Sequence, residues 1–87
     1  MIALANDKFW KDVKKLKNRQ VQRAVLEAIE NVETAENLHQ IRDLKRLKGA
    51  VAYRIRIGDY RIGVLIEDDN VEFISVGHRN KFYRTFP

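Results

Sequence analysis

The spacing of apolar residues changes once along this chain, at Gly49, and that change limits the folds the chain can adopt. Before Gly49 the apolar residues recur at intervals of three and four, which is typical of helices that bury one face. After Gly49 they alternate with polar residues, which is typical of strands with one buried face. Helices followed by a strand meander predict an α+β domain in which the helices pack on one face of an antiparallel sheet and leave the other face free.

Two helices are predicted before Gly49, after a short strand over residues 1–5. The first covers residues 7–16 with Asn6 as its N-cap, and the second follows Asn18, which caps it in the same way. The second helix carries a broad core-facing stripe, made of Val21, Ala24, Val25, Ala28, Ile29 and Val32. Over residues 34–48 the apolar residues recur every three positions, which predicts a short or irregular helical segment.

Three strands are predicted after Gly49, over residues 52–57, 60–67 and 71–77. Gly58-Asp59 is the expected two-residue turn of the first hairpin, and residues 68–70 are the expected three-residue loop of the second. This register places Arg56 opposite Arg61 and Val64 opposite Ile74. A slip of one residue in either hairpin would turn its side chains to the other face, and the two hairpins agree on which side is apolar.

The same register separates the side chains of the meander into an apolar face and a cationic face. Arg54, Arg56 and Arg61 share the cationic face with Phe73, and Arg79 follows just beyond the strand end. Opposed like charges on neighbouring strands cost roughly 0.2–1 kcal/mol per pair, so an anion held by the arginines would explain their placement. Guanidinium groups match phosphate oxygens in a two-point geometry, which makes phosphate the expected anion.

Glycines and acids near the arginines allow two further interpretations. Gly63 and Gly77 lie between the arginines, where the lack of a side chain is expected to let a backbone or a phosphate approach closely. The alternative is that the arginines are ordinary solvated side chains, screened by Asp59, Glu67 or Glu72. The convergence of four arginines from three segments favours the anion site.

Composition narrows the class of protein that such a face can serve. The 87 residues suffice for one domain over residues 1–87, and 17 Lys and Arg against 12 Asp and Glu give a formal charge of +5. A basic domain of this size favours polyanions, above all nucleic acid. Cysteine is absent, and the chain shows neither a signal peptide nor a run of about 20 apolar residues, so we expect a cytoplasmic protein without a membrane partner.

Several segments of the chain resemble the RelE/ParE superfamily of toxins from bacterial toxin–antitoxin modules. They are Leu44-Lys45-Arg46-Leu47-Lys48-Gly49, the stretch YRIRIGDYRI over residues 53–62, Val76-Gly77-His78-Arg79, and Tyr83-Arg84. The similarity extends over almost the whole chain, including the two leading helices. It implies a RelE-like fold, similar to that of microbial ribonucleases, with helices on one face of a small antiparallel sheet.

Resemblance to the RelE branch implies a toxin that cleaves messenger RNA without a metal or other cofactor, often in the ribosomal A site, and that a partner antitoxin neutralises. The expected partners are therefore mRNA, the ribosome and an antitoxin protein. The candidate catalytic residues are Arg54, Arg56, Arg61, His78, Arg79 and Tyr83. The candidate RNA-binding residues around them are Lys45, Arg46, Lys48, Phe73, Lys81 and Arg84.

Two departures from the best-known RelE toxin affect the assignment of roles. Lysines stand there at the positions of Arg54 and Arg56, and its tyrosine lies two residues farther from the glycine than Tyr83 does. Because a guanidinium group does not release its proton, Arg56 is a poor general base for attack by the 2′-hydroxyl. His78 is the natural titrating candidate, although strict strand alternation directs it to the apolar face.

Two other functions stay open at this point. A ParE-like toxin that inhibits DNA gyrase would share the fold without needing the arginine cluster. A non-catalytic RNA-binding relative would use the arginines for affinity alone, and it would show salt-dependent binding to RNA that stays intact.

Overall fold

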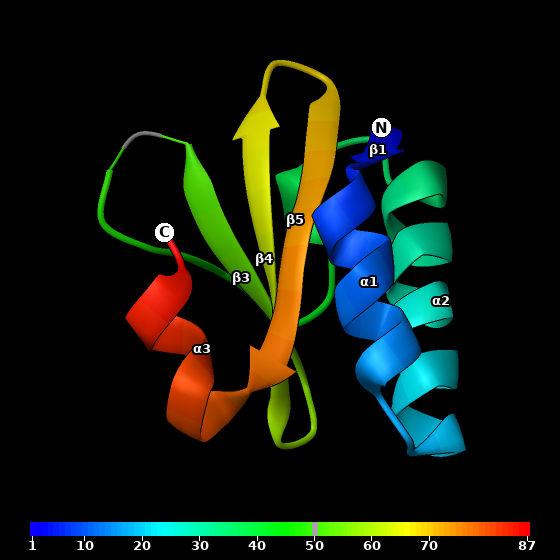
Figure 1. Ribbon diagram of the computed structural model, residues 1–87. Coiled ribbons are helices and arrows are strands. Elements are labelled where there is room, and N and C mark those ends of the chain that lie inside the picture. Colours follow the sequence, from blue (N-terminus) through cyan, green and yellow to red (C-terminus); the bar gives the residue numbers. More distant parts are fainter. Residues whose placement is uncertain (50) are drawn as a thin grey trace.

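A five-stranded sheet with helices on both faces makes up residues 1–49 and 51–87, which are the residues that the computed structural model describes (Figure 1). In chain order the elements are β1 (Ile2–Ala5), α1 (Asp7–Lys15), α2 (Arg19–Thr34), the 3-10 helix η1 (Leu38–Gln40), β2 (Leu44–Arg46), β3 (Ala52–Ile57), β4 (Tyr60–Glu67), β5 (Asn70–His78) and α3 (Arg79–Thr85). The strands lie in the order β1-β5-β4-β3-β2. The predicted α+β class is confirmed.

The two leading helices begin at the predicted N-caps. The side-chain oxygen of Asn6 accepts the backbone N–H of Phe9 at 2.8 Å, and that of Asn18 accepts two N–H groups at the start of α2. Phe9 from α1 and Val25 and Val32 from α2 are fully buried in the main core, against one face of the sheet. None of the described helices is both long and apolar enough to cross a membrane.

The first hairpin of the meander has the predicted strands, turn and register. β3 and β4 have the predicted bounds, and Ile57 pairs with Tyr60 across the turn Gly58-Asp59. Gly58 has a φ of 64°, a conformation that glycine adopts at little cost and that other residues rarely adopt. The turn that aligns the arginines of β3 and β4 is therefore specified locally.

The loop of the second hairpin is one residue shorter than predicted. Glu67 pairs with Asn70, so the loop consists of Asp68-Asp69 alone. Asp68 has a φ of 53°, in the left-handed region that the favoured two-residue hairpin turns use. Close to the loop, the strand pairing is consequently displaced by one residue from the predicted register.

A β-bulge next to Val64 absorbs this displacement and changes the environment of Phe73. Val64 pairs with Phe73 rather than with the predicted Ile74, and the predicted pairing resumes beyond the irregularity. Phe73 is fully buried in the main core, with its ring edge against Phe9 at a centroid distance of 5.4 Å. The predicted placement of Phe73 on the arginine face, and with it its role as an RNA contact, is therefore wrong.

Both edges of the sheet differ from the prediction. β1 pairs in parallel with β5, with Ala3 opposite Val71, so the sheet is mixed and not purely antiparallel. Within residues 34–48 the predicted short helical segment is present as η1, whereas β2, whose Leu44 pairs with Ile55 of β3, is a strand that was not predicted. The spacing of three in this stretch reflects side chains that reach the core from a 3-10 turn and from a strand.

A C-terminal helix, α3, covers part of the sheet face that the prediction leaves free (Figure 1). Phe82 from α3 and Phe86 after it pack with Ala52 in a second, smaller apolar cluster. A Cβ atom added at Gly63 would lie 2.8 Å from ring atoms of Phe86, and one added at Gly77 would lie 3.6 Å from the Cα atom of Phe82. The two glycines make room for the C-terminal segment. Of the two predicted alternatives, the approach of protein is therefore the one that the structure shows, and the space for a phosphate is filled.

Candidate nucleic-acid interface

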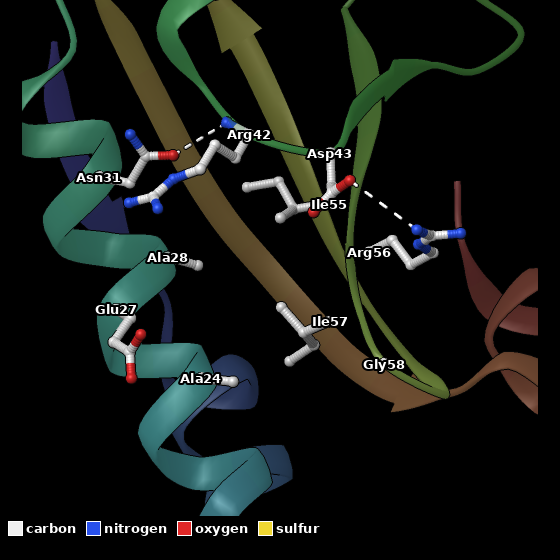
Figure 2. Close-up of a pocket in the computed structure, with 10 residues that line it drawn as sticks. All are labelled: Ala24, Glu27, Ala28, Asn31, Arg42, Asp43, Ile55, Arg56, Ile57 and Gly58. Atoms are coloured by element: carbon white, nitrogen blue, oxygen red, sulfur yellow. Dashed lines mark hydrogen bonds and ion pairs between the residues drawn. The ribbon is translucent and has the colours of Figure 1, made fainter.

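The cross-strand arginine pair lies at the centre of the candidate site. Arg56 of β3 is directly opposite Arg61 of β4, as predicted. Figure 2 shows the side chain of Arg56 directed away from α2, whereas Ile55 and Ile57 on either side of it point towards α2. Strand alternation therefore puts Arg54, Arg56 and Arg61 on the sheet face opposite α1 and α2.

Backbone carbonyl oxygens hold two of these arginines in place. Arg54 Nη1 donates to the carbonyl oxygen of Asp43 at 2.6 Å. Arg61 Nη1 donates to the carbonyl oxygens of Gly58 and Tyr60 at 2.9 and 3.0 Å. A guanidinium group has five N–H donors, so these bonds restrict the two side chains while leaving donors for an anion.

Arg56 and Arg79 have only loose partners. Arg56 Nη2 lies 4.0 Å from Asp43 Oδ1, and Arg79 Nη1 lies 3.9 Å from Asp59 Oδ1, both at the outer limit of an ion pair. All four side chains are more than half exposed. Exposed pairs of this kind contribute about 0–1 kcal/mol, so a phosphate that approaches these arginines displaces little.

The start of α3 brings Arg79 to the same end of the sheet as the arginine pair. The backbone N–H of Arg79 donates to the carbonyl oxygen of Asp59 at 2.8 Å, which ties α3 to the turn between β3 and β4. Arg61 of β4 lies two residues after Asp59 in the sequence. The predicted neighbourhood of Arg79 and the strand arginines is therefore present at the level of the backbone.

His78 occupies the junction between β5 and α3. It pairs with Tyr60 across the sheet, and the two rings meet edge to face with centroids 5.3 Å apart, on the side that alternation predicts. Its Nδ1 atom accepts the backbone N–H of Asn80 at 3.2 Å and so caps α3. In this arrangement the neutral ring carries its hydrogen on Nε2, which makes that nitrogen a donor.

The remaining candidate residues lie on α3 and around β2. Tyr83 is 52% exposed and its ring packs edge to face against Phe82. The exposed basic candidates are Lys81 and Arg84 on α3, Lys45 and Arg46 on β2, and Lys48 just after β2. The guanidinium carbon of Arg46 lies 6.0 Å from the centroid of the Tyr53 ring. All five cations are on the surface. Lys45 pairs with Arg54 and so shares the arginine face, whereas Arg46 pairs with Tyr53 and lies on the opposite side of the sheet.

Sequence reasoning missed Asp43 and α3. Asp43 accepts a hydrogen bond from Arg54 through its carbonyl oxygen and lies beside Arg56, whereas of the acids considered for screening Asp59 lies near Arg79. Asp43 has a φ of 58°, a conformation in which Asp is enriched, but a single Asp before a strand is a weak signal. For α3 a signal existed, because Phe82 and Phe86 are four residues apart and His78 precedes them as a cap.

A pocket of about 260 Å³ lies on the other side of β3, between this strand and α2 (Figure 2). Its walls include Glu27 and Asn31 of α2 and Ile57 of β3. Arg56 stands at its edge and is directed towards Asp43, away from the helix. Of the three strand arginines, Arg56 alone borders this pocket, whereas Arg54 and Arg61 are not among its lining residues.

Comparison with known proteins gives this geometry a context. Residues 5–83 match the family described as ParE toxin of type II toxin–antitoxin system, parDE. The chain is also 35% identical over 81 residues to Toxin RelE3 of Methanocaldococcus jannaschii, an alignment that covers 91% of each chain.

Solved structures have the same fold. The RelB-RelE antitoxin–toxin complex from Methanococcus jannaschii contains a chain that matches with a TM-score of 0.77 and 34% identity, covering 97% of this chain and 99% of that one. A chain of the toxin–antitoxin complex RelBE2 from Mycobacterium tuberculosis matches with a TM-score of 0.72 and 26% identity, covering 90% and 96%. The family match spans nearly the whole sequence and the identity to a RelE toxin extends over the same length. The chain therefore belongs to the RelE/ParE superfamily of toxins from type II toxin–antitoxin systems.

Proposed function

We propose that this toxin is a metal-independent endoribonuclease that cleaves messenger RNA in association with the ribosome and so blocks translation. The observation that carries the proposal is the opposition of Arg56 and Arg61 on neighbouring strands, with Arg54 beside them and Arg79 at the same end of the sheet. This arrangement places like charges together on an open face. A scissile phosphate bound there would neutralise the repulsion between the arginines and so account for their placement.

Cleavage of RNA by its own 2′-hydroxyl adds negative charge to the phosphate, and the anchored arginines suit that charge. Arg54 and Arg61 are each held by carbonyl oxygens, so their remaining donors are oriented before the substrate arrives. Preorganised donors of this kind stabilise developing charge without a cost of reorganisation during the reaction. Arg56 and Arg79, which are loosely paired, are assigned to close on the phosphate and on the leaving 5′-oxygen.

The proton transfers require a group other than an arginine. His78 can take a proton at Nδ1 only if its bond from Asn80 opens, and in the capped state it offers an N–H at Nε2. Tyr83 is exposed one turn along α3 from Asn80 and is assigned to base stacking or to proton transfer. His78 as the general base therefore implies a change at the start of α3 during the reaction.

An antitoxin protein is the second proposed partner. The solved relatives from Methanococcus jannaschii and Mycobacterium tuberculosis are toxin–antitoxin complexes. In this chain Ile2 and Leu4 of β1, Trp10 of α1 and Leu26 of α2 are 40–52% exposed. A partner that covers these side chains and opposes the +5 charge with its own acids would bury apolar area and gain electrostatic attraction.

The test measures mRNA cleavage by purified toxin in a reconstituted translation reaction, with primer extension as the readout. Arg61→Ala and Arg79→Ala should each lower the cleavage rate by roughly 100- to 1,000-fold, which is the usual effect of removing one charge-stabilising donor. Arg42→Ala is the matched control, because Arg42 is exposed, as Arg79 is, and borders the pocket between β3 and α2 rather than the arginine face. Its cleavage rate should equal that of the wild type.

The outcomes separate the candidate functions. Full cleavage by both the Arg61 and Arg79 variants would remove this face as the active site. A wild-type protein that leaves mRNA intact but inhibits supercoiling by DNA gyrase would favour the ParE-like alternative. RNA binding that falls with salt, without cleavage or gyrase inhibition, would identify a non-catalytic relative.

A further inference from the structure

The net charge of the protein is concentrated in one short stretch that the proposed active site does not use. Residues 7–23 contain seven of the 17 Lys and Arg and two of the 12 Asp and Glu, and therefore carry a formal charge of +5. The rest of the chain has ten residues of each sign and is formally neutral. The seven cations are Lys8, Lys11, Lys14, Lys15, Lys17, Arg19 and Arg23. The whole excess of positive charge thus belongs to α1, the start of α2 and the turn between them.

Six of these seven cations are available to a partner. Lys8 pairs with Asp12 at 2.9 Å. Among the described residues, no carboxylate lies within ion-pair distance of the other six, and all six are exposed. We call these six residues the α1–α2 cationic surface; they are Lys11, Lys14, Lys15, Lys17, Arg19 and Arg23.

The backbone that carries this surface is well fixed. The side-chain amide of Gln22 donates to the carbonyl oxygen of Leu16 at 2.7 Å, across the turn between the two helices. Asn18 caps α2 immediately after that turn. Val13 and Leu16, on either side of Lys14 and Lys15, pack against the main core. The cations therefore project from a rigid turn whose exposed side is entirely polar.

Helix electrostatics explain only part of this arrangement. Lys14 and Lys15 lie in the last turn of α1, where the negative end of the helix dipole favours cations. Arg19 is the first residue of α2, where the dipole favours acids, and the first turn of α2 contains no acid. A cation in this unfavourable position, next to Lys17, fits a surface that receives an external anion.

Half of the 12 acids gather at the opposite end of the molecule. Glu30, Glu33 and Glu36 lie in and just after the last turns of α2, and the residues around the β4–β5 turn add Glu67, Asp68 and Asp69. In Figure 1 the end of α2 and this turn lie at the top, whereas the α1–α2 turn, the β3–β4 turn and the start of α3 lie at the bottom. The molecule is therefore polarised along its long direction, and its positive end is the end that carries Arg79.

Contacts between the elements show that the two cationic regions are neighbours. Asp12 of α1 accepts the backbone N–H of Val76 at 3.0 Å, near the end of β5. Arg79 follows three residues later, and its own N–H donates to the turn between β3 and β4. The α1–α2 cationic surface therefore adjoins the end of the sheet from which α3 starts.

We propose that the α1–α2 cationic surface binds the phosphate backbone of folded RNA, separately from the arginine face. The identity of that RNA rests on the proposed function, in which the arginines act on a messenger held by the ribosome. The surface would then grip the structured RNA beside the scissile strand. Contacts of this kind are independent of sequence and release counterions, so their strength falls steeply with salt.

Nucleic acid fits this surface better than a protein partner does. Lysine is depleted in protein–protein interfaces, whose centres are built from aromatic and aliphatic side chains. Four of the six residues are lysines, and residues 11–23 contribute no large exposed apolar side chain among those described. The large exposed apolar residues lie outside residues 11–23; they are Ile2, Leu4, Trp10, Leu26 and Tyr83.

The test measures the affinity of the full-length protein for an RNA duplex of arbitrary sequence over a range of salt concentrations. The variant Lys14→Gln/Lys15→Gln/Lys17→Gln removes three positive charges. Glutamine is a good helix former at the two exposed positions in α1, and Lys17 lies in the exposed turn after α1. Each lost phosphate contact lowers the slope of log affinity against log salt by about 0.7–0.9. The affinity lost between about 50 and 200 mM salt should therefore be smaller by about 20- to 40-fold in this variant than in the wild type.

A control with the same net charge separates location from total charge. Asn37→Asp/Gln40→Glu/Asn70→Asp also lowers the net charge by three, at the acidic end, and keeps the side-chain oxygens that accept the N–H groups of His39 and Glu36. Its salt slope should stay within one unit of the wild type. Equal loss in the two triple variants, or an unchanged slope in the lysine variant, would overturn the proposal.

The result does not depend on catalysis. Arg61→Ala should keep most of the salt slope for duplex RNA even when it loses cleavage. If the wild type fails to cleave mRNA but the lysine variant loses its slope, this inference stands and the proposed function fails. Retention of an acidic partner protein by the wild type but not by the lysine variant, with equal RNA binding by both, would assign the surface to that partner instead.

Discussion

The contact between Gly63 and Phe86 leads to a prediction about how α3 is held on the sheet. A Cβ atom at position 63 would lie 2.8 Å from three ring atoms of Phe86, whereas ordinary contacts begin at 3.4 Å. In Gly63→Ala the ring must therefore move by at least the difference of roughly 0.6 Å, as overpacking arguments require. Phe86 belongs to the smaller apolar cluster and not to the main core, so we expect the segment of α3 to move and the sheet to stay intact.

The expected magnitude follows from overpacking. Overpacking of a filled site costs about 1–3 kcal/mol, and the gain from replacing glycine by alanine in a strand does not offset it, because β4 is folded whether α3 is docked or not. The docking of α3 should therefore weaken by about 1–3 kcal/mol, which corresponds to roughly a 5- to 160-fold larger population of the undocked state. The main core, centred on Phe9 and Phe73, does not include Phe86 and should keep its stability.

Amide hydrogen exchange measured residue by residue is the suitable assay, because it reports local opening separately from global unfolding. In Gly63→Ala the amide of Phe86, which donates to the carbonyl oxygen of Phe82, should exchange faster by that factor. Amides of β4 that lie in the core should exchange as in the wild type. Gly77→Ala is the matched control, since its Cβ atom would meet Phe82 only at 3.6 Å and should leave exchange nearly unchanged.

A double variant tests whether Gly63 is needed to make room for the Phe86 ring. In Gly63→Ala/Phe86→Ala the clash is absent, so the two changes should be non-additive by about 1 kcal/mol. Normal exchange at α3 in Gly63→Ala, together with additive effects in the double variant, would contradict the packing role of Gly63. Unchanged exchange combined with weaker RNA binding would instead restore the original hypothesis that the glycine admits a phosphate.

Two further predictions concern helix caps. His78→Asn keeps a side-chain oxygen that can cap α3 but removes the imidazole, so mRNA cleavage should fall while α3 amides stay protected; if cleavage is retained, His78 is only a cap. His78→Ala, which removes both, should also increase exchange in α3. Asn6→Ala should lower the free energy of unfolding by about 1 kcal/mol in urea denaturation, because the N–H of Phe9 loses its acceptor, and Asn6→Asp should show little change.

Local chemistry determined the elements that could be predicted from sequence. Asn6 and Asn18 mark the helix starts because their side chains accept N–H groups that have no partner within the helix. Gly58 and Asp59 specify the first hairpin because glycine accepts the positive φ of that turn. The opposition of Arg56 and Arg61 follows from this turn alone, so the centre of the candidate site was predictable.

Other features depended on contacts between distant residues. The burial of Phe73 results from a bulge opposite Val64, which compensates for a two-residue loop whose length the sequence of three polar residues leaves open. β2 is a strand because β3 offers it a hydrogen-bonding edge, although its own spacing resembles a helix. The partners of Arg54 and Arg56 at Asp43 come from a segment 11 or more residues away.

The range over which each interaction acts along the chain separates the features that were predictable from those that were not. Caps, tight turns and alternation act between residues a few positions apart, and the 87-residue sequence determined them without reference to the rest of the fold. The use of Gly63 and Gly77 was decided only when α3 folded back over the sheet, because a glycine leaves a space without indicating what fills it. Tertiary packing filled that space with Phe86 and the backbone of Phe82, and it left the neighbouring arginines open to solvent on the same face.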